Sequence, residues 1–338
     1  MGALMYEGFF GLQERPFELT PNPKYLVLTP SHREALSNLE YGIASRTGIT
    51  LLLGEAGCGK TTLIRAAIAR QPALVHCVTV MNGTLTRPEF VEILANGFGL
   101  SERARDSKAA LLLELEALLT KRLANGETTV LVVDEAQSLP LELLEEIRLL
   151  ANMETAERKL LSVIMAGQPE LAARLNEQSL RQFKQRVGLR CELPRLTSNE
   201  TVAYISGRIR AAGGIAAHVF TREAVVMMHQ AANGIPRTIS VIADNALLTA
   251  FAINQRPVNS HTVTEVARNF DFIPAEHPSR SASPAVVAVP AQPASPPASE
   301  ELSEELPVAA AVGAQRPAMF AAATKRRRFS FFRSAEKS

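Results

Sequence analysis

The sequence lacks several features that mark specialised classes of protein. It has no run approaching 18 consecutive apolar residues, so it predicts no transmembrane helix. Its N-terminus lacks the basic and then apolar regions of a secretory signal, and a net charge of only +2 gives no overall signature of nucleic-acid binding. The cysteines, Cys58, Cys77 and Cys191, show neither pairing nor metal-ligand spacing, which is typical of a reducing cytosol. With 46% hydrophobic and 21% charged residues, the composition is globular.

What the sequence does contain is a phosphate-binding motif. An apolar run at 49–53 leads into a Gly-rich turn and then Lys60-Thr61, which fits the P-loop pattern G-x-x-x-x-G-K-[ST]. The glycines let backbone N–H groups converge on a phosphate, and the following helix adds the positive end of its dipole. We expect Lys60 to reach the β- and γ-phosphates of ATP and the Thr61 hydroxyl to ligate Mg²⁺. The predicted nucleotide-binding residues of this motif are Gly54, Glu55, Ala56, Gly57, Cys58, Gly59, Lys60, Thr61 and Thr62.

A second motif follows about 75 residues later. The apolar stretch Val130–Val133 predicts a short buried strand that ends in Asp134-Glu135, a pattern that looks like a Walker B segment. We expect Asp134 to orient Mg²⁺ and Glu135 to polarise the water that attacks the γ-phosphate. The alternative interpretation is an acidic pair that caps the next helix.

Two further polar residues stand where they can sense the γ-phosphate. Gln168 ends the predicted strand Leu160–Ala166, so it is a candidate contact with the γ-phosphate or the attacking water; otherwise it is a turn residue before Pro169. Arg237 follows Pro236 at the predicted start of a helix, which would let it point back at the nucleotide. Its alternative is an ordinary solvated arginine.

A basic segment, 180–187, offers an arginine to a neighbouring subunit. The planar guanidinium suits phosphate oxygens, and Arg186, just before an apolar strand-like stretch, is the preferred candidate for an arginine finger. Arg181 is the second option. A basic helix face in water, including Lys184, is the alternative interpretation.

The order of apolar and amphipathic segments predicts the fold class. Continuously apolar strands alternate with helices up to about residue 194, which indicates a parallel sheet covered by helices on both faces. Four helical patterns then follow without strands, and Pro, Ala and Ser dominate the C-terminal region, which predicts a disordered tail. The predicted domains are an N-terminal arm at 1–30, an α/β P-loop ATPase core at 31–194, an all-α lid at 195–272 and the tail at 273–338.

Taken together, these motifs resemble the AAA+ superfamily in type and order. The segments Tyr6–Leu12, Arg15–Phe17, Thr20–Pro23 and Asp134–Gln137 look more narrowly like the general secretion pathway protein A type of AAA+ ATPase. The similarity extends over about residues 5–272. It implies an ATPase with ATP and Mg²⁺ as cofactors, and it implies that the segment ahead of the P-loop frames the base. The base-pocket candidates on that ground are His32, Phe17 and Leu28.

The resemblance also shapes the predicted biological role. Proteins of this type typically continue into a transmembrane helix and a peptidoglycan-binding domain, whereas this chain is expected to be one of the shorter relatives found beside envelope, pilus or exopolysaccharide-export genes. We therefore predict a cytoplasmic homo-oligomer that supports a cell-envelope secretion or export machine. The alternatives are a DNA-associated ATPase of the transposon target-selection type and a regulatory nucleotide-binding module, although Glu135 argues against the latter.

The C-terminal end bears on partners. Residues 325–338 hold six Lys or Arg and one Glu, a net charge of +5, together with three Phe residues. Such a segment could make peripheral contact with the anionic inner membrane, bind nucleic acid, or serve only as a solubilising end or partner peptide.

Overall fold

The computed structural model describes residues 6–19, 23–72, 74–81 and 84–273. The chain divides into two compact units, Met1–His277 and Pro278–Ser338. The predicted tail from residue 274 onward, with its basic aromatic end, lies outside the described residues. None of the helices in the described part of the chain combines the length and the hydrophobicity needed to span a bilayer.

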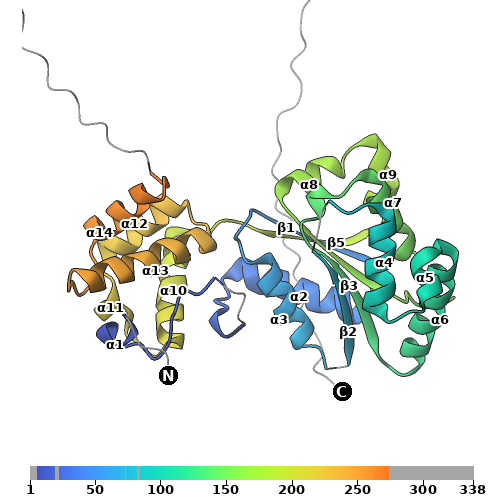
Figure 1. Cartoon of the computed structure of the whole chain (residues 1–338), viewed down its shortest axis with the longest axis horizontal. Coiled ribbons are helices and arrows are strands. Elements are labelled where there is room, and N and C mark those ends of the chain that lie inside the picture. The colour runs from blue at the N-terminus through green and yellow to red at the C-terminus, as the bar shows by residue number, and fades with distance from the viewer. Residues whose placement is uncertain (1–5, 20–22, 73, 82–83, 274–338) are drawn as a thin grey trace, which may run out of the picture. The chain divides into compact units, whose positions relative to one another are not determined.

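A five-stranded parallel sheet forms the centre of the first domain (Figure 1). The strand order is β2-β3-β4-β1-β5, and every neighbouring pair is parallel, which confirms the predicted α/β P-loop fold. Because the strands are parallel, their carboxyl ends meet at one edge, where ligands bind in such sheets. The strands are β1 (Ile49–Gly54), β2 (Val75–Val80), β3 (Thr128–Val133), β4 (Ser162–Gly167) and β5 (Val187–Leu193).

Helices cover both faces of this sheet, as the continuously apolar strands predict (Figure 1). Alternate side chains of one strand serve opposite faces: Leu51 and Leu53 pack in the cluster that includes α4, α6 and α7, whereas Leu52 packs with α2 and α3. The helices are α2 (Pro30–Ser45), α3 (Lys60–Ala69), α4 (Arg87–Phe98), α5 (Glu102–Asp106), α6 (Lys108–Ala124), α7 (Leu141–Leu150), α8 (Pro169–Arg174) and α9 (Arg181–Lys184).

The start of α2 corrects one sequence expectation. The pattern Ser31-His32-Arg33-Glu34 predicts a capping box with Ser31 as the cap, but the N-cap is Thr29 and the helix begins at Pro30. Proline is favoured at the first helical position because its φ is already helical and its missing N–H is not needed there. The Thr29 hydroxyl accepts the N–H of His32, which brings this histidine's ring to the carboxyl end of the sheet.

Helices replace strands after residue 194. The structure confirms the helices that the sequence predicts at 198–212, 221–232, 236–253 and 261–269, with each end within one residue, and adds the short α11. The helices are α10 (Ser198–Ala211), α11 (Ala216–Val219), α12 (Arg222–Ala232), α13 (Pro236–Ala252) and α14 (Ser260–Asn269). The domain boundaries predicted from the sequence stay predictions.

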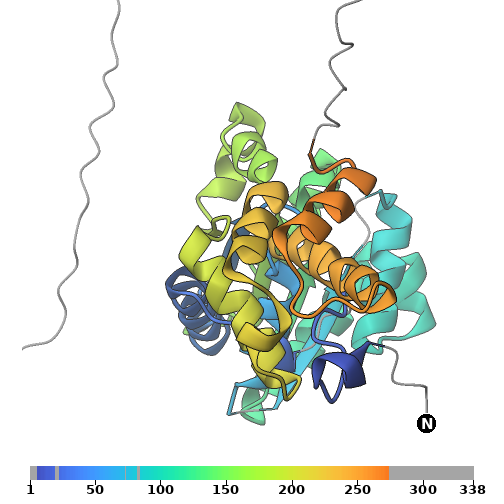
Figure 2. The ribbon, with the colours of Figure 1, turned by 90° about the vertical axis from the view of Figure 1, so that its left-hand side faces the viewer.

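The N-terminal segment belongs to the core of these helices (Figure 2). The sequence predicts an extended arm that lies on the domain surface, but the segment forms α1 (Glu7–Phe10) and a 3₁₀ turn, η1 (Pro23–Tyr25). Tyr6, Phe10 and Phe17 are at most 1% exposed and pack among apolar residues of α10 and α12–α14. These rings are large enough to fill the centre of a small helical domain, so the arm completes that core rather than covering it.

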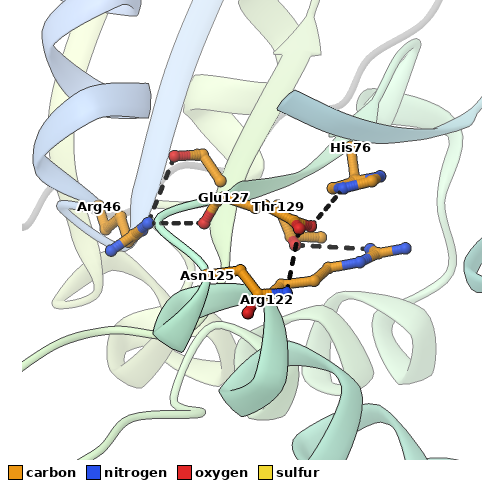
Figure 3. A network of polar contacts seen from close by, with 7 residues as sticks. Arg46, His76, Arg122, Asn125, Glu127 and Thr129 are labelled. Carbon is orange, nitrogen blue, oxygen red and sulfur yellow. Dashed lines mark hydrogen bonds and ion pairs between the residues drawn. The ribbon is translucent and has the colours of Figure 1, made fainter. Parts of the chain in front are cut away.

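A polar network closes the edge of the sheet where the strands begin (Figure 3). Arg46, which ends α2 in the left-handed conformation (φ 50°), donates from Nη2 to the backbone oxygen of Glu127 at 2.9 Å. The Glu127 carboxylate contacts His76 Nε2 at 2.6 Å and accepts a hydrogen bond from Asn125 at 3.2 Å. The network thus ties α2, the end of α6 and the first residues of β2 and β3 together.

Candidate active site

The loop between β1 and α3 has the conformation that the phosphate-binding motif predicts. Gly57 and Gly59 adopt φ values of 82° and 94°, which glycine reaches without strain. A Cβ on Gly57 would also lie 2.7 Å from the Cβ of Arg237, so only glycine allows α13 to approach the loop this closely. The Lys60 ammonium is buried and donates to the backbone oxygens of Gly54 at 2.8 Å and Glu55 at 3.1 Å. The cation is therefore already held inside the loop.

A hydrogen bond between a hydroxyl and a carboxylate joins this loop to the end of β3. The Thr61 hydroxyl donates to Asp134 Oδ2 at 2.6 Å, and the other oxygen of the buried Asp134 carboxylate accepts the Glu135 N–H at 2.9 Å. One carboxylate and one hydroxyl suit Mg²⁺, which takes few protein ligands and completes its shell with phosphate oxygens and water. The described residues contain no group of three or more His, Cys, Asp or Glu that could hold a metal by itself. The donor set therefore fits a cation that arrives with a phosphate ligand.

Glu135 occupies a backbone conformation that few non-glycine residues adopt. Its φ is 53° and its ψ 38°, in the left-handed region, and such strain is concentrated at functional sites. Two amides hold its carboxylate: Oε2 accepts from Gln137 Nε2 at 2.6 Å and from Gln168 Nε2 at 3.4 Å. The Gln137 side chain also accepts the backbone N–H of Gln168 at 3.1 Å. Gln137 therefore connects the ends of β3 and β4.

A cavity of about 360 Å³ opens between the loop and the helical domain. Its volume lies at the lower end of the range of small-molecule sites. Lys60, Glu135 and Arg237 line it, which brings three of the predicted chemical residues to one space. The lining residues are Glu18, Leu19, Tyr25, Leu26, Val27, His32, Gly57, Cys58, Gly59, Lys60, Thr61, Thr62, Glu135, Leu196, Tyr204, Arg208, Pro236, Arg237 and Ser240.

His32 supports the back of the loop. Its Nδ1 lies 2.7 Å from the Thr29 hydroxyl and its Nε2 3.3 Å from the backbone oxygen of Cys58. These partners fit a neutral ring that donates from Nε2 and accepts at Nδ1, and burial lowers the pKa of His32 below its ordinary value. Burial also raises the pKa of the Cys58 thiol, which disfavours the reactive thiolate at this loop position.

Two base-pocket candidates lie elsewhere. Phe17 packs edge-on against Phe220 at 6.1 Å inside the helical domain, and Leu28 packs against the α2–α3 side of the sheet. Neither lines the cavity, and their assignment to the base pocket stays a prediction. The segment ahead of the P-loop supplies the wall instead through residues 25–27.

The arginine candidates fall in different places. Arg237 donates its backbone N–H to the Gly57 oxygen at 3.2 Å and lies beside the loop. Arg186 is exposed at the start of β5, and its backbone oxygen accepts the N–H of Ile49 at the start of β1. The length of β1 therefore separates Arg186 from its own loop by about 17 Å. Arg181 begins α9 and is also exposed.

Sequence reasoning missed three contributors. Gln137 stands in the Walker B segment without an assigned role, and its signal is only its distance of two residues from Glu135. Arg195, in the connection to the helical domain, forms an ion pair with Glu55 of the loop at 2.7 Å. Arg208 lines the cavity from α10, with no motif to indicate it.

Comparisons with known proteins agree with this geometry. Residues 43–175 match the AAA domain family. Over 249 residues the chain is 41% identical to general secretion pathway protein A of Aeromonas hydrophila; the alignment covers 73% of this chain and 45% of that protein. The chain thus spans less than half the length of this curated relative.

Solved structures share the fold at low sequence identity. The ORC2 protein of Aeropyrum pernix, in its ADPNP-ADP complexes, is 17% identical with a TM-score of 0.59, covering 76% of this chain and 71% of that one. Cdc6p from Pyrobaculum aerophilum is also 17% identical, with a TM-score of 0.56 and coverage of 75% and 70%. The chain is therefore an AAA+ protein of the general secretion pathway protein A-like type.

Proposed function

We propose that this chain hydrolyses ATP in a Mg²⁺-dependent reaction. The observation that carries the proposal is the Glu135 carboxylate, which two amides hold in a left-handed turn at a cavity that also contains Lys60. A site that only holds nucleotide needs no carboxylate aimed at water, whereas hydrolysis does.

The residues divide the reaction between them. The backbone N–H groups of the loop and Lys60 bind the phosphates, and Gln168 and Arg237 contact the γ-phosphate or the water next to it. Thr61 and Asp134 would hold Mg²⁺, which neutralises phosphate charge when bound. Glu135 orients a water molecule and accepts its proton as the water oxygen bonds to the γ-phosphorus and the bridging oxygen leaves with ADP.

Steady-state hydrolysis of ATP tests this proposal. We expect turnover by the chain in Mg²⁺, loss of turnover in EDTA, and no turnover by Lys60→Ala, which removes the phosphate-binding cation. Lys121→Ala, which removes an exposed lysine on α6 outside the site, is the control. Equal phosphate release by the chain and by Lys60→Ala would contradict the proposal.

We propose further that the active form is a homo-oligomer in which Arg186 completes the neighbour's site. Its support is the exposed side chain of Arg186 and its distance from the cavity of its own chain. Arg186→Ala should lose turnover while still binding ATP, and mixing it with Lys60→Ala should restore part of the activity. Absence of rescue in mixed assemblies would contradict action between subunits, and a larger loss in Arg181→Ala would transfer the role to Arg181.

The biological role that we propose is support of a cell-envelope secretion or export machine. It rests on the similarity to general secretion pathway protein A and on the basic, aromatic residues near the C-terminus. ATPase rates should rise with anionic lipid vesicles in the full chain but not in a 1–320 truncation. Stimulation by duplex DNA and not by vesicles would instead support a DNA-associated ATPase.

A further inference from the structure

Arg208 on α10 is a buried cation whose hydrogen-bond acceptors are all neutral. Arg208 is 8% exposed. None of the carboxylates in the described part of the chain forms an ion pair with it. Its guanidinium donates to the Tyr204 hydroxyl, to Ser240 Oγ at 3.1 Å and to the backbone oxygen of Glu18 at 3.2 Å, while Nε is buried without a partner. Because burying a cation without a counter-charge costs free energy, its position calls for a functional reason.

Aromatic rings replace the missing carboxylate. The Arg208 guanidinium carbon lies 5.1 Å from the ring centre of Tyr25, 5.4 Å from that of Tyr204 and 5.9 Å from that of Phe17. These distances are those of cation–π contacts. Two of the rings come from the N-terminal segment and one from α10, so a single side chain joins parts of the chain that are far apart in sequence.

The same side chains form one end of the cavity. Tyr25, Tyr204, Arg208 and Ser240 line it together with the P-loop. The Ser240 hydroxyl also donates to the backbone oxygen of Pro236 at 3.0 Å, in the first turn of α13. Arg208 is thereby linked through Ser240 to the turn that carries Arg237.

The wall next to this cluster suits a flat, weakly polar group. Residues 25–27 and Leu196 supply a tyrosine ring and three aliphatic side chains beside Arg208 and Glu18, whereas Lys60 and Glu135 line the cavity at the loop and at the end of β3. A nucleoside triphosphate with its phosphates in the loop would place its base toward residues 25–27 and α10.

We propose that Arg208 is a positioning residue that sets the nucleobase preference of the cavity, an inference that rests on the proposed binding of ATP. It braces Phe17 and Tyr25 against α10 and so fixes the width of the slot for a purine base. Without the brace the slot loosens, purine contacts weaken, and discrimination against the smaller pyrimidine base falls.

Kinetics with ATP and CTP test the inference. Arg208→Met keeps the length of the side chain but removes the charge and the donors; it should raise the KM for ATP about tenfold, leave kcat within about twofold and lower the ATP-to-CTP ratio of kcat/KM by about fivefold or more. Ser240→Ala should shift the ratio in the same direction by less. Arg210→Met, at an exposed arginine of the same helix, is the matched control and should change none of these values.

The outcomes separate the inference from the proposed function. A parallel loss of activity with both nucleotides, or an unchanged ratio in Arg208→Met, would overturn the role of Arg208. If the unmodified chain hydrolyses no ATP, the proposed function fails, and equilibrium binding of ATP and CTP carries the same comparison for Arg208. If Arg208→Met does not fold, Arg208→Lys replaces it: the ammonium lacks the planar fork, so the ratio should still fall, and a retained ratio would overturn the inference.

Discussion

Polar networks lie at both ends of the parallel strands. The network at the strand starts is satisfied within the chain at Glu127, whereas the network at the strand ends faces a cavity. Glu135 and Arg46 both adopt the left-handed conformation without being glycine, with φ values of 53° and 50°. At the strand starts, Arg46 uses its guanidinium to bind the backbone at Glu127. At the strand ends, Glu135 presents its carboxylate to a cavity. The left-handed conformation therefore lets Arg46 bind the backbone where the strands begin, and it lets Glu135 face the cavity where the strands end.

The partners of the charged groups show the same difference. His76 donates to Glu127, and this hydrogen bond together with that from Asn125 holds the pKa of the Glu127 carboxyl below its ordinary value, so this carboxylate finds its partners within the chain. In the site, Lys60 donates to loop carbonyls, and Thr61 to Asp134, and a phosphate with its cation offers both groups better partners. Substitutions at the strand ends should therefore change turnover, and those at the strand starts should change stability.

Among the residues that support the charged groups of the two networks, Gln137→Ala should have the largest effect. It removes the amide that holds Glu135 and the acceptor of the Gln168 N–H, so kcat should fall by roughly 10- to 100-fold because the carboxylate loses its orientation. ATP affinity and the unfolding temperature should change little, since the side chain is only half-buried. Gln182→Ala, an exposed glutamine in α9, is the control for ATPase assays and thermal unfolding. An unchanged kcat in Gln137→Ala would remove the distinction between the two networks.

Substitution of Arg46 tests the other edge. Arg46→Ala should lower the free energy of unfolding by about 1–3 kcal/mol, because buried acceptors at the start of β3 lose a charged donor. Arg46→Gly loses the same bonds but relieves the left-handed strain, so it should be more stable than Arg46→Ala by about 1 kcal/mol. Denaturant titration measures both values, and the KM and kcat for ATP should stay unchanged. A loss of turnover without a loss of stability would contradict the assignment of this edge to folding.

How far the sequence predicts the site depends on whether its residues are contiguous. The loop at 54–62 and the pair Asp134-Glu135 follow directly from apolar strands, so local spacing alone places them at one edge of the sheet. The parallel sheet itself follows from its central strands β1, β3 and β4, which are buried at every position. In these stretches the local sequence pattern is enough to place the residues at the carboxyl ends of the strands, where the structure has them.

The parts that could not be predicted depend on contacts across the chain. Arg208 meets Tyr25 and Phe17 only because the N-terminal segment folds into the helical domain, and no local pattern encodes that contact. Gln137 acquires its role from the register between β3 and β4, which places Gln168 within reach. Thr29 displaced the predicted cap Ser31 because Pro30 suits the first helical position, a preference that outweighed the capping-box pattern.

The smallest effect concerns the pH dependence of stability at the site edge. Because the folded-state pKa of His32 lies below its ordinary value of 6.5, the unfolded chain binds more protons just below pH 6.5 and stability falls there as the pH decreases. The contribution is fully present above pH 6.5, and its slope cannot exceed about 1.4 kcal/mol per pH unit for one group. His32→Gln keeps an amide donor but does not titrate, so its stability should fall less between pH 6.5 and 5. Equal pH slopes from denaturant titrations would show that His32 is not held neutral.

The central claim is that Glu135 supplies the chemistry while the loop supplies the binding, and Glu135→Gln measured beside the unmodified chain tests it most directly. The amide keeps the size of the side chain but cannot accept a proton from water. ATP should bind Glu135→Gln with an affinity within about threefold of that of the unmodified chain, while the single-turnover rate of hydrolysis falls by about 100-fold or more. A variant that hydrolyses ATP at the normal rate would contradict the account.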